Sequence, residues 1–195
     1  MNNKKTILTV FILVALAQIY VPAKMILERE DILKTGKEFK FKTTPIDPSD
    51  PFRGKYITLR FDENSIEVNQ EEKWERDEPV YLILTTDMEG FVKLQSVKKQ
   101  KPDDNQDFLK TKVNYLYQKN DSTKISELSF DYPFDRFYME ESKAYEAELT
   151  YNESIRDTAK VTYALVNIKE GDAVLKDVVI NGIPIKKIVK ARRKE

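Results

Sequence analysis

The chain contains no cysteine and no histidine, and only five of its 195 residues are glycine. Without cysteine and histidine there is no thiol nucleophile, no imidazole base and no Ser–His pair, which excludes much of the usual acid–base and covalent chemistry. The usual zinc sites are excluded too, because their ligands are mainly Cys and His. We therefore expect no metal, no cofactor and no enzymatic activity. The absence of cysteine fits an extracytoplasmic compartment, although many cytosolic proteins also lack it.

The formal net charge is zero, but the charges are distributed unevenly. The first 27 residues hold three lysines and no acid, which leaves 30 basic and 33 acidic residues for the rest of the chain. Such a nearly neutral domain lacks the strong basic field that nucleic acid requires of a partner. The exception is the C-terminal end, which we interpret as a solvated basic tail over residues 187–195, with contact to anionic lipid headgroups as the alternative.

The N-terminus, MNNKKTILTVFILVALAQIYVPAKMIL, contains a long apolar run. Eighteen helical residues, 6–23, span about 27 Å, which is close to the hydrocarbon thickness of a bilayer. We therefore predict a membrane anchor over residues 1–27 that crosses the lipid bilayer through residues 6–23. The alternative is a cleaved signal peptide, because Ala15-Leu16-Ala17 has the pattern of a cleavage site.

The charges that flank the apolar run predict its orientation. Lys4 and Lys5 precede the run, whereas charges of both signs follow it. The positive-inside tendency then places the N-terminus in the cytoplasm and the rest of the chain outside it. Residues 28–36 predict a short helical stalk that Gly36 ends as a C-cap.

Residues 37–186 are dominated by patterns typical of strands. Lys37–Thr43 and Tyr56–Phe61 alternate apolar and polar side chains, and Pro79–Thr85 is a continuous apolar run that suits a central strand. Further strands are predicted at residues 91–97, 113–117, 136–139, 159–168 and 173–180. Glu140–Tyr151 predicts a helix. The fold class is therefore mostly antiparallel β, a sandwich or partly open barrel with one short helix, preceded by the transmembrane helix, and the alternative class is α+β.

Most aromatic side chains in this domain are predicted to lie in the core, and fewer to contact a ligand or a partner. Alternation places Val113, Tyr115 and Tyr117 on one face of a strand. The aromatic segment Phe130–Met139 is predicted to be core. Trp74 lies among charges and is predicted to be half-buried over a strand, with an exposed contact for a sugar or a protein as the alternative.

The segment PIDPSDPFRG, residues 45–54, is the most unusual part of the chain. Its three prolines fix φ, Asp47 and Asp50 can cap local turns, and Arg53 can pair with one of these carboxylates. It is interpreted either as a corner locked by its own bonds or as a rigid loop that presents Asp47, Asp50, Arg53 and Tyr56 to a partner. Carboxylate-based hydrolysis and calcium binding at the aspartates have less support, because acids are 33 of 195 residues and no D-x-D-x-D-G loop is present.

The stretch DPSDPFRGKYITLRF resembles the motif PxDPxDPxRGDYxxLxY of the GDYXXLXY family of bacterial membrane-associated proteins. The matching residues are Pro45, Asp47, Pro48, Asp50, Pro51, Arg53, Gly54, Tyr56 and Leu59. The ending AVLKDVVINGIPI is similar to the C-terminal hairpin of the family. Lys55 replaces the motif's Asp and Phe61 replaces its last Tyr, and both departures favour a structural role for the motif.

The resemblance implies a single-pass protein of the bacterial inner (cytoplasmic) membrane with a periplasmic or otherwise extracytoplasmic domain. It implies no established activity, but it suggests an accessory role beside a multi-pass membrane protein. Our first hypothesis is thus a non-enzymatic interaction protein that presents the corner Asp47–Arg53 and Tyr56. The alternative is an envelope glycan-binding or carboxylate-based hydrolase domain, with Asp47 or Asp50 as the working acid and Trp74 as a stacking platform.

Overall fold

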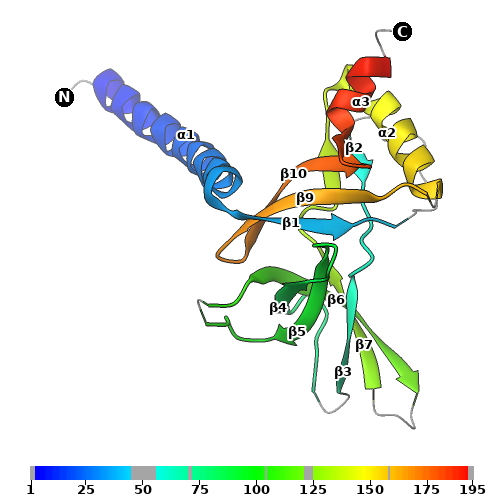
Figure 1. The fold of residues 1–195 in the computed structure, drawn as a ribbon. Coiled ribbons are helices and arrows are strands. Elements are labelled where there is room, and N and C mark those ends of the chain that lie inside the picture. The colour runs from blue at the N-terminus through cyan, green and yellow to red at the C-terminus, as the bar shows by residue number, and fades with distance from the viewer. Residues whose placement is uncertain are drawn as a thin grey trace.

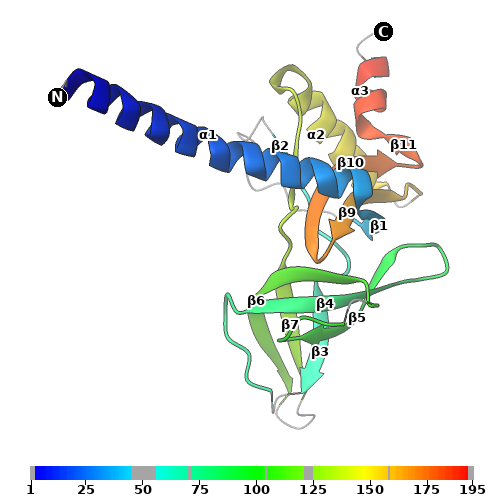
Figure 2. The same cartoon turned by 90° about the vertical axis from the view of Figure 1, so that its left-hand side faces the viewer.

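The computed structural model describes residues 3–44, 56–69, 72–103, 105–120, 125–157 and 159–192. The elements in chain order are α1 (Asn3–Thr35), β1 (Lys37–Lys42), β2 (Tyr56–Thr58), β3 (Ser65–Asn69), β4 (Pro79–Thr86), β5 (Val92–Lys98), β6 (Phe108–Asn120), β7 (Ile125–Asp131), β8 (Arg136–Tyr138), α2 (Glu141–Arg156), β9 (Thr162–Lys169), β10 (Asp172–Ile180), β11 (Ile183–Pro184) and α3 (Ile185–Arg192). Helix α1 extends away from a domain built of strands and two shorter helices (Figures 1 and 2). The predicted class, mostly antiparallel β after a long N-terminal apolar helix, is confirmed.

The lower part of the domain is a five-stranded antiparallel sheet in the order β3-β7-β6-β4-β5 (Figure 1). The sheet curls until its two edges approach each other. Glu63, just before β3, accepts a hydrogen bond from the backbone amide of Leu94 in β5 at 3.2 Å and pairs with Lys93. The result is a nearly closed barrel, as the partly open barrel of the prediction anticipates. Strands β3 and β7 were absent from that prediction.

The upper part of the domain is a four-stranded sheet in the order β1-β9-β10-β11, beside the short pair β2–β8. Strand β1 pairs with β9 so that Phe39 lies opposite Val166. The predicted hairpin of β9 and β10 is confirmed, and its connection uses Glu170 and Gly171, both at positive φ. Helices α2 and α3 stand next to each other at the upper end of the domain (Figures 1 and 2).

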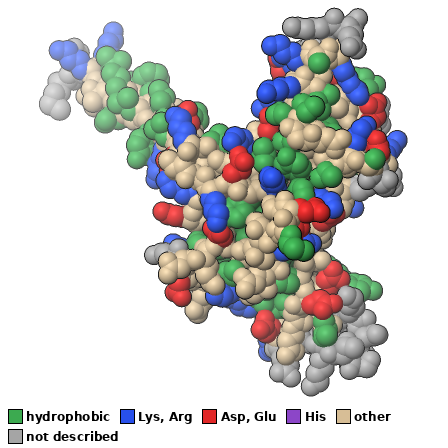
Figure 3. Space-filling model, in the orientation of Figure 1, with side chains coloured by type: hydrophobic (Ala, Val, Ile, Leu, Met, Phe, Trp, Pro, Cys, Tyr) green, Lys and Arg blue, Asp and Glu red, His purple; other side chains and the backbone are tan. Residues whose placement is uncertain are grey.

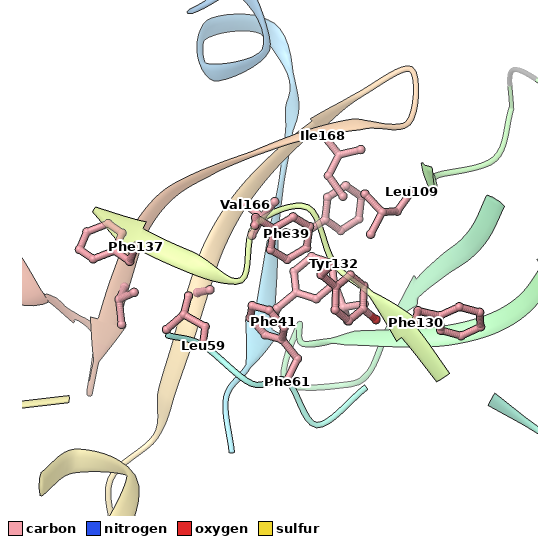
Figure 4. Close-up of a cluster of buried hydrophobic side chains, with 14 of the residues drawn as sticks. Phe39, Phe41, Leu59, Phe61, Leu109, Phe130, Tyr132, Phe137, Val166 and Ile168 are labelled. Carbon is pink, nitrogen blue, oxygen red and sulfur yellow. The ribbon is translucent and has the colours of Figure 1, made fainter. Parts of the chain in front are cut away.

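The core between the two parts is built around a cluster of aromatic rings. The ring centroid of Phe41 lies 5.8 Å from that of Phe61, 5.6 Å from that of Tyr132 and 5.0 Å from that of Phe134. Figure 4 shows Phe41, Phe61 and Tyr132 gathered together. Edge-to-face geometry of this kind adds stability beyond the burial of area. Because Phe130, Tyr132, Phe134 and Phe137 are buried, the predicted core role of this segment is confirmed for these four rings, whereas Tyr138 is 63% exposed.

Helix α1 ends where the sequence predicts, at the residue before Gly36. The amide of Gly36 donates to the carbonyl of Ile32 at 2.9 Å, and a Cβ at position 36 would lie 2.5 Å from that oxygen. Only glycine fits this close approach without displacing the helix end. The predicted stalk, residues 28–36, therefore continues α1 without a break up to Gly36.

The C-terminal segment differs from its prediction. Residues 187–192 were assigned to a solvated basic tail, but Ile185–Arg192 forms helix α3. Ile185 and Val189 are both fully buried, one helical turn apart, so α3 packs an apolar stripe on the domain and turns its basic residues outward. Ile188 is partly buried beside them, and the interspersed basic residues conceal this stripe in the sequence.

Candidate functional site

Most of the predicted site lies outside the described residues. This applies to Asp47, Pro48, Asp50, Pro51, Arg53 and Gly54, as well as to Pro45 and Lys55 of the motif. For these residues the corner and the presented loop both stay predictions. The described part of the motif begins at Tyr56.

The second half of the motif is structural. Leu59 is 4% exposed and lies in the core cluster, and its backbone amide donates to the carbonyl of Asp135 at 2.7 Å. Phe61 is 3% exposed and packs edge-to-face on Phe41. Figure 4 shows Leu59 and Phe61 in this core. These two motif positions therefore shape the core and offer nothing to a ligand.

Tyr56 is the motif residue that reaches the surface. It pairs with Tyr138 across β2 and β8, and the two ring centroids are 5.4 Å apart. The guanidinium carbon of Arg136 lies 5.1 Å from the centre of the Tyr56 ring. Tyr138 is 63% exposed, whereas Tyr56 is half-buried. Tyr56 thus belongs to a surface cluster of two phenols and one guanidinium.

A second aromatic surface lies on β6 and corrects a prediction. Val113 is buried, but Tyr115 and Tyr117, which were expected to share its face, are 63% and 60% exposed. The register shifts between Val113 and Tyr115, so Asn114 is an extra residue in the pairing with β7. A β-bulge of this kind turns the following side chains to the opposite face of the sheet. Sequence alternation alone carries no sign of the bulge.

The outward rows of β3, β7 and β6 define one surface, which we call the tyrosine face. In one row across the sheet, Ser129 lies between Tyr115 and Ser65. In the next row, Glu127 lies between Tyr117 and Glu67. These six residues make up the tyrosine face. The Ser65 hydroxyl donates to the Glu127 carboxylate at 2.5 Å. In Figure 3 acidic and hydrophobic side chains adjoin at the lower right, on the side of β3 and β7.

Trp74 has the half-buried position that the sequence predicts. It packs against the core cluster, and the Lys99 ammonium lies 4.6 Å from its ring centre. Lys99 is fixed there by Glu78, 2.8 Å away, and this hydrogen bond lowers the pKa of the Glu78 carboxyl. A lysine therefore occupies one face of the only tryptophan in the chain, and the ring also lines a pocket of about 680 Å³.

Among the described residues, no three acidic side chains come close enough together to hold a metal ion. Burial raises the pKa of Glu148 on α2 and of Asp177 on β10. Burial also raises the pKa of the Tyr151 phenol to about 12. Each shift follows from the local packing of one side chain.

The junction between α1 and the domain is a network of polar contacts. Lys169 on β9 donates to the Asp31 carboxylate at 2.6 Å and to the Thr35 hydroxyl at 2.9 Å. The buried Asn167 donates to the carbonyl of Leu33 at 2.9 Å. The Lys169 hydrogen bond lowers the pKa of Asp31. Beside these contacts a groove of about 860 Å³ runs between α1 and the domain.

Helix α1 has the composition of a membrane span. Its most apolar part has a mean hydropathy of 2.1, and none of that part is buried against the rest of the chain. A signal sequence near the N-terminus has the same properties. The helix is therefore a candidate for a single crossing of a membrane.

Comparison with known protein families agrees with the sequence motif. A family model described as GDYXXLXY protein matches residues 18–178. The chain belongs to the GDYXXLXY family. The match includes the end of α1, the motif and the tyrosine face of this GDYXXLXY protein, and it confirms the predicted family. No curated protein and no solved structure matches the chain.

Proposed function

We propose that this GDYXXLXY protein is a single-pass, non-enzymatic interaction protein of the bacterial inner membrane. Its β domain would lie on the extracytoplasmic side and bind a second membrane protein, of the multi-pass class, through the tyrosine face. The corner Asp47–Arg53 with Tyr56 is retained as a second surface for the same partner.

The anchor and its orientation rest on α1. Its apolar surface is exposed along the whole span, and burial of this surface in lipid removes it from water. Lys4 and Lys5 lie at the N-terminal end of α1, away from the domain, and favour a cytoplasmic N-terminus. The domain that follows then lies outside the cytoplasm.

The junction supports a domain held close to the bilayer. Lys169 and Asn167 attach the last turns of α1 to β9, and only Gly36 separates α1 from β1. A domain attached in this way meets proteins that share its membrane far more often than it meets free proteins. An accessory role beside another membrane protein fits this placement.

The single observation that carries the proposal is the exposure of Tyr115 and Tyr117 next to Glu67 and Glu127. Tyrosine is enriched at protein interfaces because it offers a large apolar ring and one polar group. Carboxylates beside aromatic rings favour a partner that presents Lys or Arg, through ion pairs and cation–π contact. The bulge turns two tyrosine rings into solvent, so the fold loses the stabilisation that their burial would give. A role in contact with a partner explains why the rings are exposed.

The test is capture of partners from membranes with the intact anchored chain. The variant Tyr115→Ser/Tyr117→Ser removes the two exposed rings, and Tyr145→Ser/Leu149→Ser on α2 removes a comparable exposed apolar area elsewhere. We expect recovery of a specific membrane protein to fall at least about ten-fold with the first variant only. Equal recovery with both variants contradicts the tyrosine face as the contact, and recovery of no membrane protein by the unaltered chain contradicts the interaction role.

A further inference from the structure

We propose that a groove beside α1, separate from the tyrosine face, binds the headgroup of an anionic phospholipid in the same membrane. The surface is a groove of about 500 Å³ between α1, β8 and β10, and we call it the basic groove. The side chains that matter in it are those of Arg29, Arg136, Lys176, Lys186, Asp135 and Tyr138. The inference rests on the proposed function in one respect, because it requires α1 to be inserted in a bilayer.

The position of Arg29 places the groove at the level of lipid headgroups. From Thr6 to Leu27 the chain has 22 residues, of which Lys24 is the only charged one, and as a helix they extend about 33 Å against about 30 Å of hydrocarbon. Lys24 is close enough to the end to direct its ammonium outward. Met25 and Leu27 are 54% and 66% exposed. Arg29 follows two residues later, about 3 Å farther along the axis, which is within the headgroup layer.

The charge of the groove suits a phosphate. Four of its charged residues are basic and one is acidic. Lys176 is paired with Glu38 at 2.7 Å, and Arg136 lies 3.9 Å from Asp135. Within the described part of the chain, no carboxylate lies within ion-pairing distance of the remaining two, Arg29 and Lys186. The Asp177 carboxylate on β10 is near enough to Lys186 for a Coulombic interaction, which partly offsets the rise that burial causes in the Asp177 pKa.

Those two side chains are available to an anion. The Lys186 ammonium lies over the Phe137 ring, 5.2 Å from its centre, which directs it toward β8. Arg29 lines the same groove from α1. Guanidinium and ammonium groups are the donors that bind phosphate in proteins, and Arg29 and Lys186 supply one of each to this groove.

An exposed tyrosine at the groove supports contact with the membrane surface in particular. Tyr138 is 63% exposed, and its ring lies against that of Tyr56 at an interplanar angle of 56°. Tyrosine is enriched at the headgroup level of membranes, because its ring enters the apolar boundary while its hydroxyl stays hydrated. Figure 2 shows α1 passing in front of β9 and β10 of the upper sheet, and these are the strands that its last turns contact.

The basic groove and the tyrosine face differ in position and in charge. The groove adjoins α1 and has a basic excess, whereas the tyrosine face lies on β3, β7 and β6 and contains two carboxylates. The first therefore fits a lipid headgroup and the second a basic protein partner. Binding at one does not require binding at the other.

Photo-crosslinking in lipid nanodiscs tests the inference. The full chain carrying Tyr138→p-benzoylphenylalanine is reconstituted, one chain per disc, in phosphatidylcholine alone or in an equimolar mixture with phosphatidylglycerol. After illumination the intact mass shows how much protein carries a lipid adduct and which lipid it is. We expect phosphatidylglycerol to exceed its share of the bilayer at least about three-fold among the adducts, and this excess to fall with added salt.

Matched variants separate the groove from general attraction to a charged bilayer. Arg29→Gln/Lys186→Gln should abolish the excess of phosphatidylglycerol adducts, whereas Lys98→Gln/Lys101→Gln, with the same loss of charge, should preserve it. An unchanged melting temperature of each variant shows that the domain is intact. Adducts in proportion to the lipid composition, or equal loss in both variants, overturn the inference. Failure of the chain to insert into the discs instead contradicts the membrane anchor of the proposed function.

Discussion

The Lys169 ammonium lies 2.6 Å from the Asp31 carboxylate, although the two residues are 138 positions apart in the chain. Lys169 is near the tip of the β9–β10 hairpin, and Asp31 is one turn from the end of α1. The same ammonium also contacts the Thr35 hydroxyl. One side chain thus connects the helix end to the hairpin in two places.

Removal of this side chain should loosen the helix end without unfolding the domain. For Lys169→Met we expect amide exchange of residues 32–36 to accelerate several-fold, because the last turn of α1 loses two of its contacts. The melting temperature should stay nearly unchanged, since exposed ion pairs contribute little to global stability. Hydrogen exchange with mass spectrometry measures the change. Lys160→Met, which removes an ion pair to Asp157, is the control, and equal exchange in both variants would show that Lys169 does not hold the helix end.

The motif leucine should behave as a core residue. For Leu59→Ala we expect a loss of about 2–5 kcal/mol in the free energy of unfolding, from lost burial and the cavity left behind. The neighbouring Thr58, the last residue of β2, is exposed, and Thr58→Ala should change the value by no more than about 0.5 kcal/mol. Urea unfolding in detergent gives both numbers. A small effect of Leu59→Ala would mean that this motif position has a role outside the core.

Gly171 and Gly182 offer a matched pair of substitutions. Both have positive φ, 87° and 79°, so an alanine strains the backbone at either position by about 1–2 kcal/mol. A Cβ at Gly171 would in addition lie 2.5 Å from a ring carbon of Phe108, whereas nothing lies within 4 Å at Gly182. We expect Gly171→Ala to cost about 1–3 kcal/mol more than Gly182→Ala, as measured by denaturant unfolding. Equal costs would show that the Phe108 ring can move aside.

Buried phenols should make the protein sensitive to alkali. Burial raises the pKa of Tyr151 to about 12, above its ordinary value of 10, and also raises that of Tyr132. The folded state therefore holds these protons more tightly than the unfolded state does. Their contribution to stability is complete below pH 10 and is lost as the pH rises toward 12. Tyr151→Phe should reduce this decline by roughly 2–3 kcal/mol, and urea unfolding across a pH series tests it. The same decline in the variant would contradict the burial of Tyr151 as its cause.

The strand pattern could be predicted from sequence wherever one face of a strand is buried and the other is exposed. In β1 the buried Phe39 and Phe41 alternate with lysines, and the prediction for this segment agrees with the structure. Strand β3 was missed because Ile66 and Val68 are its only apolar residues. Strand β7 was missed because one of the three residues in its buried row, Ser126, Leu128 and Phe130, is polar, and that serine is buried by its place in the sheet.

The candidate surfaces were harder to predict, because each depends on contacts between distant segments. The bulge at Asn114 reverses the exposure of Tyr115 and Tyr117, and it is defined only by the pairing of β6 with β7. The basic groove joins Arg29 to Lys186, which lie at opposite ends of the chain. A feature that could have indicated α3 is the spacing of Ile185 and Val189, one helical turn apart among basic residues. Residues 45–54 carry much of the resemblance to the family, but they lie outside the described residues.

Only Gly36 lies between the end of α1 and the start of β1, and it is held by the carbonyl of Ile32. This one-residue connection restricts rotation of the β domain relative to α1. A bilayer that is thinner than the apolar run makes a helix tilt. In this protein such a tilt would swing the whole β domain through the same angle, so that the thickness of the membrane sets the direction in which the tyrosine face points.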